Sequence, residues 1–292
     1  MSKFTLGTDP ELMLVQNGAV VSAIEPLNER DKYDKISDKE SGTAFYCDNV
    51  LLEGNVEPSS SPDQFVSNLR GLFSHFHKQF PDYSLVAQAS HTFSEKECSH
   101  LKAKQFGCEP EFDVDARAEV RPPTPESAKN FRSAGGHIHI GMLESKWLED
   151  LENKVYGVQL MDLYVGIPMV LMDNDPTSPD RKVLYGKAGR FRFTPYGIEY
   201  RTPSNFWTST PELSALVAEL TLWVMEQADS GRAEELVGAF DRAAVVDCIN
   251  NHSKFTALEI VNNIPLPEEL LGRIIVASEQ EHKANVIENW KL

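Results

Sequence analysis

The segment from Gly135 to Gly141 reads GGHIHIG, which alternates histidine with isoleucine between glycines. In a β-strand this spacing puts His137 and His139 on one face and the two isoleucines on the other. Two imidazoles on one face can present neutral nitrogen ligands to a metal or hydrogen bonds to a phosphate. The glycines leave room for a ligand or another strand. The segment therefore predicts a strand that carries part of a functional site, with a plain solvated face as the structural alternative.

Acidic residues occur in pairs within segments that have the composition of strands. The pairs are Asp9 with Glu11, Glu53 with Glu57, and Glu109 with Glu111. A carboxylate inside an apolar run such as Val50-Leu51-Leu52-Glu53 is costly unless a cation pairs with it. Oxygen ligands suit Mg²⁺ or Mn²⁺ better than zinc. The pairs therefore indicate a divalent-cation site, although 44 acidic residues also make surface carboxylates common.

Cations gather in one later segment of this acidic chain. Lys187, Arg190 and Arg192 lie close together and among glycines. Such an island is typical of a phosphate or carboxylate site, with a solvated charge run as the alternative. Glu199 and Arg201 follow at a spacing of two, so they share a strand face. They extend the candidate site, unless they form only a local or cross-strand ion pair.

Charge and motif content exclude several classes of function. The 292 residues include 28 Lys and Arg against 44 Asp and Glu, a net charge of −16. Such a surface repels duplex nucleic acid but suits divalent cations. The sequence has no G-x-x-x-x-G-K-[ST] or G-x-G-x-x-G phosphate loop and no G-x-S-x-G nucleophile motif. ATP, if used, must then be held by metal ions and arginines.

The remaining composition predicts a reduced, soluble, cytoplasmic protein with no membrane partner. The four cysteines lie far apart and have no zinc-like spacing. The N-terminus does not read as a signal peptide. The apolar stretch from Val155 to Met172 contains Gln159, Asp162 and Pro168, so it fits a buried helix better than a membrane span.

The order of periodic segments predicts an α+β fold. Strands are expected at 4–15, 44–57, 84–90, 105–114 and within 135–141, and a strand pair is expected over 190–201 around Pro195-Tyr196-Gly197. A helix should begin after Ser61, because a serine cap, Pro62 and Gln64 precede apolar residues at helical spacing. Further helices are expected at 144–172, broken near Pro168, and from 209 onward. This order predicts an antiparallel or mixed sheet with helices on one side. We expect one catalytic domain over 1–292, with the motifs in about 5–207 and a helical tail over 208–292.

Taken in order, the acid strand, the next glutamates, His-x-His and Glu-x-Arg resemble the glutamine synthetase and glutamate–cysteine ligase superfamily. The phrases GTDPELML, LLEGNVEPS, GCEPEFDV, RSAGGHIHIG, YGKAGRFRF and GIEYRTPSNFW resemble, more closely, the phage-type amidoligases called COOH-NH2 ligase type 2. The resemblance implies a glutamine synthetase-like sheet that forms an open, barrel-like active site with helices on its outer side. It also implies an ATP- and Mg²⁺- (or Mn²⁺-) dependent carboxylate–amine ligase that acts through an acyl phosphate.

The resemblance assigns roles to the candidate residues. The implied metal ligands are Asp9, Glu11, Glu53, Glu57, His137 and Glu199, with the choice between Glu53 and Glu57 open. The groups implied to face the phosphates are His139, Lys187, Arg190, Arg192 and Arg201. Arg201 would contact the transferring phosphoryl group. Glu109 or Glu111 could take the proton of the amine, and this pair is also a rival for the role of the first acid strand.

The expected partners are a small-molecule or peptide carboxylate and an amine. A homo-oligomer is allowed, since members of the superfamily often assemble, and a phage-encoded protein would act in the cytoplasm of its host. Two alternatives stay open. A metal-dependent hydrolase could use the same carboxylates and histidines to activate water, and a non-catalytic protein could bind a nucleotide or metal there.

Overall fold

The structure is a computed structural model that describes residues 2–105, 110–121 and 128–292. Its first sheet has six strands, and every neighbouring pair is antiparallel. In spatial order these strands are β1 (Phe4–Thr8), β12 (Ile138–Met142), β14 (Gly197–Tyr200), β13 (Arg190–Thr194), β9 (Glu111–Asp113) and β10 (Ala118–Val120). The strand expected from the GGHIHIG segment is thus central in this sheet.

A second antiparallel sheet is built mainly from the N-terminal third of the chain. Its path is β3 (Ala19–Val21), β2 (Glu11–Gln16), β6 (Leu51–Asn55), β5 (Thr43–Asp48) and β4 (Ile36–Asp38), and β7 (Ser84–Val86) also pairs with β2. A separate pair consists of β8 (Ser90–Thr92) and β11 (Phe131–Ser133).

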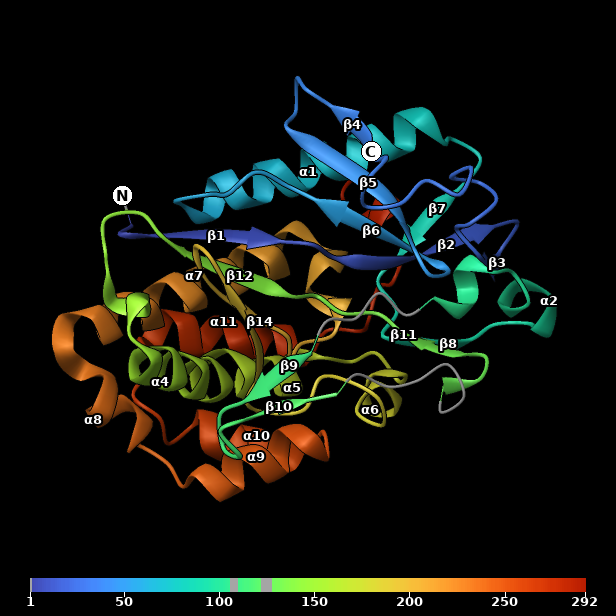
Figure 1. Cartoon of the computed structure of the whole chain (residues 1–292). Helices are drawn as coiled ribbons and strands as arrows, with labels where there is room; N and C mark the ends of the chain where they lie inside the picture. Colours follow the sequence, from blue (N-terminus) through green and yellow to red (C-terminus); the bar gives the residue numbers. More distant parts are fainter. Residues whose placement is uncertain (1, 106–109, 122–127) are drawn as a thin grey trace.

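The two sheets meet where β1 passes into β2. Asp9 and Pro10 form this junction, and Pro10 has no N–H to contribute to a ladder. A bridge between Leu6 and Ser59 also ties β1 to the chain that follows β6. In Figure 1, β5 and β6 lie on one side of β1, and β12 and β14 lie on the other. The result is one curved, open surface of antiparallel strands.

Helices cover the side of the first sheet that bears the isoleucines. They include α4 (Leu151–Met161), α5 (Ile167–Met172), α7 (Pro211–Gln227) and α11 (Glu268–Ser278), of which α4, α5 and α11 are drawn below β12 in Figure 1. The helix α1 (Pro62–Gln79) packs on β5 and on α7. The other helices are α2 (Glu95–Cys98), α6 (Ser178–Arg181), α8 (Ala233–Val237), α9 (Arg242–Asn250), α10 (Lys254–Val261) and α12 (Val286–Asn289). The chain is therefore α+β, with antiparallel sheets as predicted.

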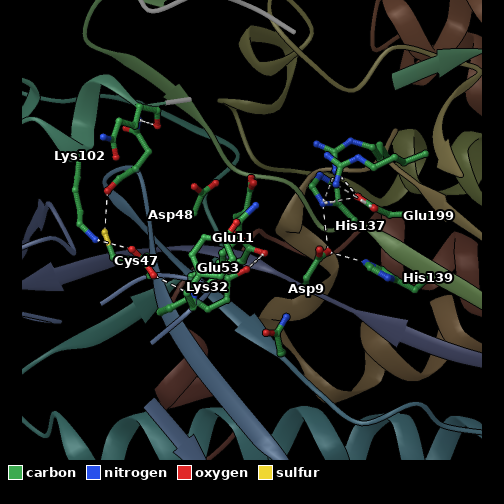
Figure 2. A pocket seen from close by; sticks show the side chains of 18 residues that line it. Asp9, Glu11, Lys32, Cys47, Asp48, Glu53, Lys102, His137, His139 and Glu199 are labelled. Carbon is green, nitrogen blue, oxygen red and sulfur yellow. Dashed lines mark hydrogen bonds and ion pairs between the residues drawn. The ribbon is translucent and has the colours of Figure 1, made fainter. Parts of the chain in front are cut away.

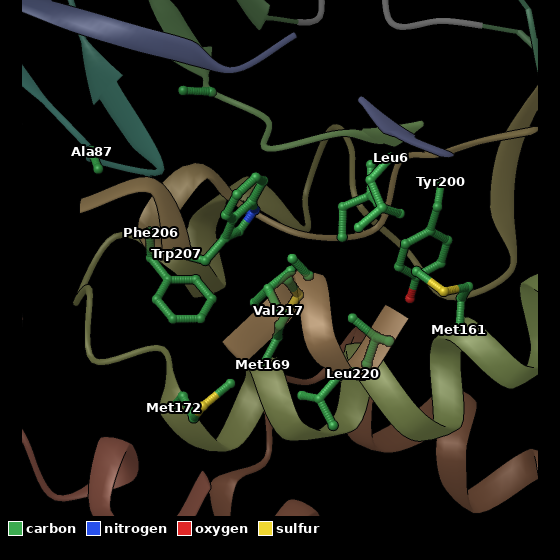
Figure 3. Close-up of a cluster of buried hydrophobic side chains, with 14 of the residues drawn as sticks. Leu6, Ala87, Met161, Met169, Met172, Tyr200, Phe206, Trp207, Val217 and Leu220 are labelled. Carbon is green, nitrogen blue, oxygen red and sulfur yellow. The ribbon is translucent and has the colours of Figure 1, made fainter. Parts of the chain in front are cut away.

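A contiguous core fills the space between the first sheet and these helices (Figure 3). Ile138, Ile140 and Tyr200 point into it and are almost fully buried. Trp207 stacks on Phe65 of α1 with 5.8 Å between ring centroids, and its Nε1 donates to Gly136 O at 3.2 Å. Removing a buried tryptophan of this kind typically costs about 3–5 kcal/mol. This packing fixes β12 from behind.

Several predicted elements need correction. The expected strand 44–57 is a hairpin, because Asn49 has a φ of 55° and turns the chain between β5 and β6. The helical run of 144–172 does not break at Pro168. Instead, a π-helical turn over Asp162–Gly166 joins α4 to α5, and Pro168 lies in the first turn of α5. The predicted start of α1 is confirmed, since Ser61 Oγ accepts from Gln64 N at 3.3 Å.

The segment Leu151–Met172 is long and apolar enough to cross a membrane by length and composition alone. However, 89% of its most apolar part is buried inside the protein. This burial agrees with the prediction of a core helix.

Candidate active site

Polar side chains form two rows across the face of the first sheet that is opposite to the helices. In one row, Gly7, His139, Glu199 and Arg192 are successive register partners on β1, β12, β14 and β13. Two residues further along each strand lie Asp9, His137 and Arg201, just beyond the ends of β1, β12 and β14. The predicted alternation is confirmed, because Ile138 and Ile140 face the core. Antiparallel pairing thus brings together residues that the sequence places far apart.

Asp9 stands between the two histidines (Figure 2). Its Oδ1 lies 3.2 Å from His137 Nδ1 and 3.0 Å from His139 Nε2. Burial alone would raise the pKa of Asp9, but the interactions with His139 and His137, the charge of His139 foremost, outweigh it and hold that pKa well below 3.8. Burial would lower the pKa of His139, and Asp9 reverses that effect, so the net shift is upward. The Asp9 carboxylate is therefore charged at neutral pH.

Glu199 completes a first cluster, which we call the histidine cluster: Asp9, His137 and Glu199. Each residue offers one ligand atom, and these atoms lie within 4.8 Å of one another. Glu199 Oε1 is 3.6 Å from His137 Nδ1. Burial and the charge of Asp9 would raise the pKa of Glu199, but Arg201 and the histidines lower it overall. This cluster already has cations beside it, so its carboxylates keep their charge.

Arg201 is buried and forms ion pairs with two carboxylates. Its Nε donates to Glu111 Oε1 at 2.6 Å, and its Nη1 donates to Glu199 Oε1. Burial would lower the pKa of Arg201, but Glu199 and Glu111 raise it overall. Arg192 approaches the other oxygen of Glu199, with Nη1 3.3 Å from Oε2. Two guanidinium groups therefore flank the histidine cluster.

A second cluster, here called the acid cluster, consists of Glu11, Asp48 and Glu53. Its three ligand atoms also lie within 4.8 Å of one another. Burial, reinforced by Glu11, raises the pKa of Asp48 to about 6. Burial and the charges of Asp9, Asp48 and Glu11 raise the pKa of Glu53 well above 4.5, although a hydrogen bond from Tyr46 opposes the shift. Unlike Asp9 and Glu199, the carboxyl groups of Asp48 and Glu53 therefore have a pKa above the usual range.

Both clusters line one cleft of about 400 Å³, a volume within the range of small-ligand sites. Figure 2 shows Glu11, Asp48 and Glu53 beside Asp9, with His137 and Glu199 on its other side. Arg192, Arg201 and Lys32 also line the cleft, and Lys102 lies toward its far end from the histidines.

A side pocket of about 50 Å³ shares Glu11, Asp48, His137 and Arg201 with the cleft. Its other walls include Leu51, Phe131, Leu184 and the buried guanidinium of Arg181. Arg181 donates to the main-chain oxygens of Thr202 (2.9 Å) and Arg201 (3.2 Å). Burial lowers its pKa to about 10 despite the charge of Glu11, so Arg181 is still a cation at neutral pH.

His139 is held from the outside by Tyr196, which lies on the turn between β13 and β14. The Tyr196 hydroxyl hydrogen-bonds to His139 Nδ1, and the two rings stack with 6.0 Å between centroids. Because Nδ1 is occupied in this way, Nε2 is the atom turned toward Asp9. Tyr196 therefore sets the orientation of the imidazole.

The structure does not bring every candidate into this cleft. Glu57 lies beyond the end of β6, and its exposed side chain lies against Gly42. It therefore does not join Glu53 on the strand face that lines the cleft. Lys187 is exposed. Arg190 forms an ion pair with Asp113 at 3.1 Å, so of the three cations of this segment only Arg192 lines the cleft. Glu109 lies outside the described residues.

Glu111, an expected proton acceptor, does not line the cleft, because its carboxylate is paired with Arg201. The sequence interpretation also missed three residues of the site: Asp48, Tyr196 and Arg181. For Asp48 the available clue was Asn49, whose tolerance of positive φ permits the hairpin that carries Asp48 back beside Glu53. No local pattern marked the other two.

The glycines of the GGHIHIG segment prove to accommodate protein atoms. A Cβ on Gly135 would lie 2.3 Å from His137 Nε2, and one on Gly136 would lie 2.4 Å from Trp207 Nε1. These glycines thus allow the close packing that positions His137. The space predicted for a ligand or another strand is filled by side chains of the protein itself.

The residues fit divalent cations. Each cluster supplies three closely spaced ligand atoms, mainly the hard oxygens that Mg²⁺ and Mn²⁺ prefer. Asp9 Oδ1 and His139 Nε2 are buried and have no hydrogen-bond partner within residues 2–105, 110–121 and 128–292, because their close approach lacks hydrogen-bond geometry. Buried polar atoms without such partners are uncommon in folded proteins.

The site thus combines two acidic clusters with flanking arginines on a curved antiparallel surface. A family model described as phage phiEco32-like COOH.NH2 ligase-type 2 matches residues 123–245. This match confirms the predicted resemblance to the phage-type amidoligases, and the family name indicates a carboxylate–amine ligase. No functionally curated protein matches the chain.

The family match covers one half of the site. It includes His137, His139, Arg192, Glu199 and Arg201, whereas the acids of β2, β5 and β6 precede it. It also runs through α7 and α8 into α9, beyond residue 207 where the predicted resemblance ended.

Proposed function

We propose that this protein is an ATP- and Mg²⁺-dependent carboxylate–amine ligase that forms an amide or peptide-like bond through an acyl phosphate. The observation that carries the proposal is the arrangement of two neighbouring acidic clusters in one cleft, with Arg192 and Arg201 beside them. We further propose that the curved sheet is the open barrel of a glutamine synthetase-like fold.

The histidine cluster and the acid cluster would each hold one Mg²⁺ or Mn²⁺. A cation bound there would neutralise the negative charge of the phosphates of ATP. Asp9 and Glu199 are suited to this role because both stay charged near neutral pH. Of the two glutamates left open by the sequence, Glu53 fits a ligand and the exposed Glu57 does not.

Arg201 and Arg192 would stabilise the charge of the phosphoryl group during its transfer. Arg201 suits this task because Glu111 and Glu199 fix its guanidinium before any substrate arrives. His139 presents Nε2 on the same face, with Tyr196 holding its other nitrogen. Preorganised donors of this kind typically contribute about 10²–10³-fold each to rate.

In the first step an oxygen of the substrate carboxylate would attack the γ-phosphorus, and the bond from that phosphorus to ADP would break. The amine nitrogen would then attack the acyl carbon, forming the amide and releasing inorganic phosphate, while the amine loses a proton. Glu109 remains a candidate for accepting this proton, since Glu111 is paired with Arg201. We place the substrate carboxylate at the mouth of the side pocket, near Arg181.

Hydroxylamine offers a test that does not need the natural amine, because it converts an acyl phosphate into a stable hydroxamate. Purified protein would be incubated with ATP, MgCl₂, hydroxylamine and a panel of carboxylic acids, and ADP and hydroxamate would be measured. We expect equal amounts of both products with at least one acid. EDTA should abolish them, and Glu199→Gln should reduce them by about 10²-fold.

Glu57→Gln serves as the matched control, since it removes an exposed acid that was a candidate ligand. It should leave ADP and hydroxamate formation unchanged. Metal-dependent cleavage of a substrate without ATP would favour the hydrolase. If nucleotide binds but no acid in the panel produces ADP, a non-catalytic binding protein is the better description.

A further inference from the structure

A fully buried carboxylate, Asp162, lies behind the sheet on the side away from the cleft. It begins the π-helical turn that joins α4 to α5. Asp162 Oδ1 accepts a hydrogen bond from the Tyr200 hydroxyl at 2.7 Å, and Oδ2 accepts one from Gly189 N at 2.7 Å. Arg242 Nη2 pairs with Oδ2 at 2.8 Å. One carboxylate thus ties β14, the chain before β13 and the start of α9 together.

Tyr200 connects this buried group to the cleft. It lies on β14 between Glu199 and Arg201, and alternation along the strand sends its ring to the helices and its neighbours to the cleft. A shift of the Tyr200 hydroxyl would therefore shift the backbone that carries both Glu199 and Arg201. Figure 3 shows Tyr200 reaching from the sheet toward the helix that bears Met161, which precedes Asp162.

Arg242 has a second contact that also leads to Arg201. Its Nε and Nη2 donate to the two carboxylate oxygens of Asp115 at 2.9 Å and 2.7 Å. Asp115 lies in the turn that follows β9, and β9 carries Glu111, which holds Arg201 Nε at 2.6 Å. Arg242 is thus linked to both supports of Arg201. It reaches β14, which precedes Arg201, through Asp162, and it reaches β9, which carries Glu111, through Asp115.

A contribution to stability alone does not explain the Arg242–Asp162 ion pair well. Taking two charges out of water is costly, and apolar side chains of similar size often stabilise a protein as well or better. Asp162 is fully buried and Arg242 is partly buried. Such a pair allows little variation in the positions of its partners, because each hydrogen bond lost by Asp162 leaves a buried oxygen unsatisfied. Neither Asp162 nor Arg242 lines the cleft.

We propose that Arg242 and Asp162 are positioning residues that fix β14 and β9 and thereby hold the Arg201 guanidinium in its place in the cleft. The helical part of the chain would then contribute to the site without touching a substrate. The expected kinetic effect rests on the proposed ligase function, whereas the effect on the Arg201 side chain does not.

The first test follows the Arg201 Nε–H group by NMR in the full-length protein. Its resonance would be assigned by its loss in Arg201→Lys. We expect Arg242→Met to shift this resonance and speed its exchange with water, and Arg242→Lys to give a smaller change. Arg232→Met is the matched control, because Arg232 makes a similar two-pronged contact with Glu235 on the exposed surface. It should leave the Arg201 resonance in place.

The second test is kinetic and uses the hydroxamate assay. Arg242→Met should lower kcat about 10–100-fold and change the KM for ATP less than about 3-fold, since Arg242 does not contact the cleft. Combined with Glu111→Gln, its effect should be less than additive, because both changes release the same guanidinium. Asp115→Asn, on an exposed turn, tests the β9 contact if Arg242→Met does not fold.

An unchanged Arg201 resonance in a folded Arg242 or Asp115 variant would overturn the proposal. A kinetic effect that is fully additive with Glu111→Gln would also overturn it. If the wild-type protein releases no ADP, the ligase function fails, while the NMR result still decides the positioning role.

Discussion

Glu11 on β2 and Glu53 on β6 are register partners, so two carboxylates stand directly opposite each other on neighbouring antiparallel strands. Like charges in this relation destabilise a sheet by about 0.2–1 kcal/mol. Burial and the charges of Asp9, Asp48 and Glu11 hold the pKa of Glu53 above its usual range. A cation bound between them would relieve the repulsion, so the metal-free protein should be less stable than the metal-bound form.

We predict that Glu53→Gln makes the metal-free protein more stable by up to about 1 kcal/mol. The same change should remove most of the stabilisation that MgCl₂ gives to the wild type, because a ligand is lost. Urea unfolding in EDTA and in millimolar MgCl₂ measures both effects. Glu57→Gln should behave like the wild type in both solutions. A Glu53→Gln protein that keeps the full Mg²⁺ effect would exclude Glu53 as a ligand.

We predict that Glu111→Gln slows the first half of the reaction. Glu111 holds Arg201, so its loss should reduce ADP formation about 10–100-fold even when the concentration of the amine is saturating. A base that deprotonates the amine would instead affect only the second step and leave acyl phosphate to accumulate. Rapid-quench measurement of ADP and of hydroxamate separates the two. Normal ADP formation with slow amide formation would restore Glu111 as the base.

We predict that Tyr196→Phe weakens nucleotide binding with little change in stability. The hydroxyl holds His139 Nδ1 at the edge of the cleft, whereas the ring of phenylalanine keeps the stacking contact. Loss of one hydrogen bond corresponds to about 1 kcal/mol, so the Kd for a non-hydrolysable ATP analogue with Mg²⁺ should rise about 5-fold. Isothermal titration calorimetry measures the Kd. An unchanged Kd would remove His139 from the phosphate site.

We predict that Lys182 makes stability rise with pH above neutrality. Burial, aided by the charge of Arg181, lowers its pKa from 10.5 to about 7. Between these two values the unfolded chain binds a proton that the folded protein has released, so the free energy of unfolding increases as pH rises.

Lys182→Met removes this contribution. The stability of the wild type relative to the variant should therefore increase between pH 7 and pH 10 by more than about 1 kcal/mol. Urea unfolding of both proteins across this range measures the difference. Lys146→Met, at an exposed position, controls for the loss of a positive charge. A constant difference between wild type and Lys182→Met would show that Lys182 titrates alike in the folded and unfolded states.

The sequence predicted those parts of the site that depend on the alternation of side chains along a single strand. His137 with His139 and Glu199 with Arg201 lie as expected, because alternation fixes which side chains share a face. The cap of α1 followed in the same way from local chemistry. Local rules were enough wherever the interacting residues are close in the chain.

Contacts between distant segments could not be read in the same way. The partner of Arg190 is Asp113, because β13 lies beside β9, and Arg201 takes Glu111 for the same reason. The choice of Glu53 over Glu57 depended on where β6 ends. Asp48 entered the site through a hairpin whose turn lacks glycine, so the turn was missed. Each of these outcomes is set by strand pairing, which is not encoded in any single segment.

The junction of β1 and β2 also determines when a chain emerging from the ribosome can assemble the histidine cluster. Asp9 is made well before its neighbours His137 and Glu199, which come much later in the chain. Until β12 has left the exit tunnel, Asp9 has no histidine partner across the first sheet, and the cluster lacks Glu199 until β14 follows. Closing so long a loop is entropically costly. Pairings of this separation are typical of slow folding. A nascent chain should therefore be unable to hold a cation at the histidine cluster before β14 has emerged.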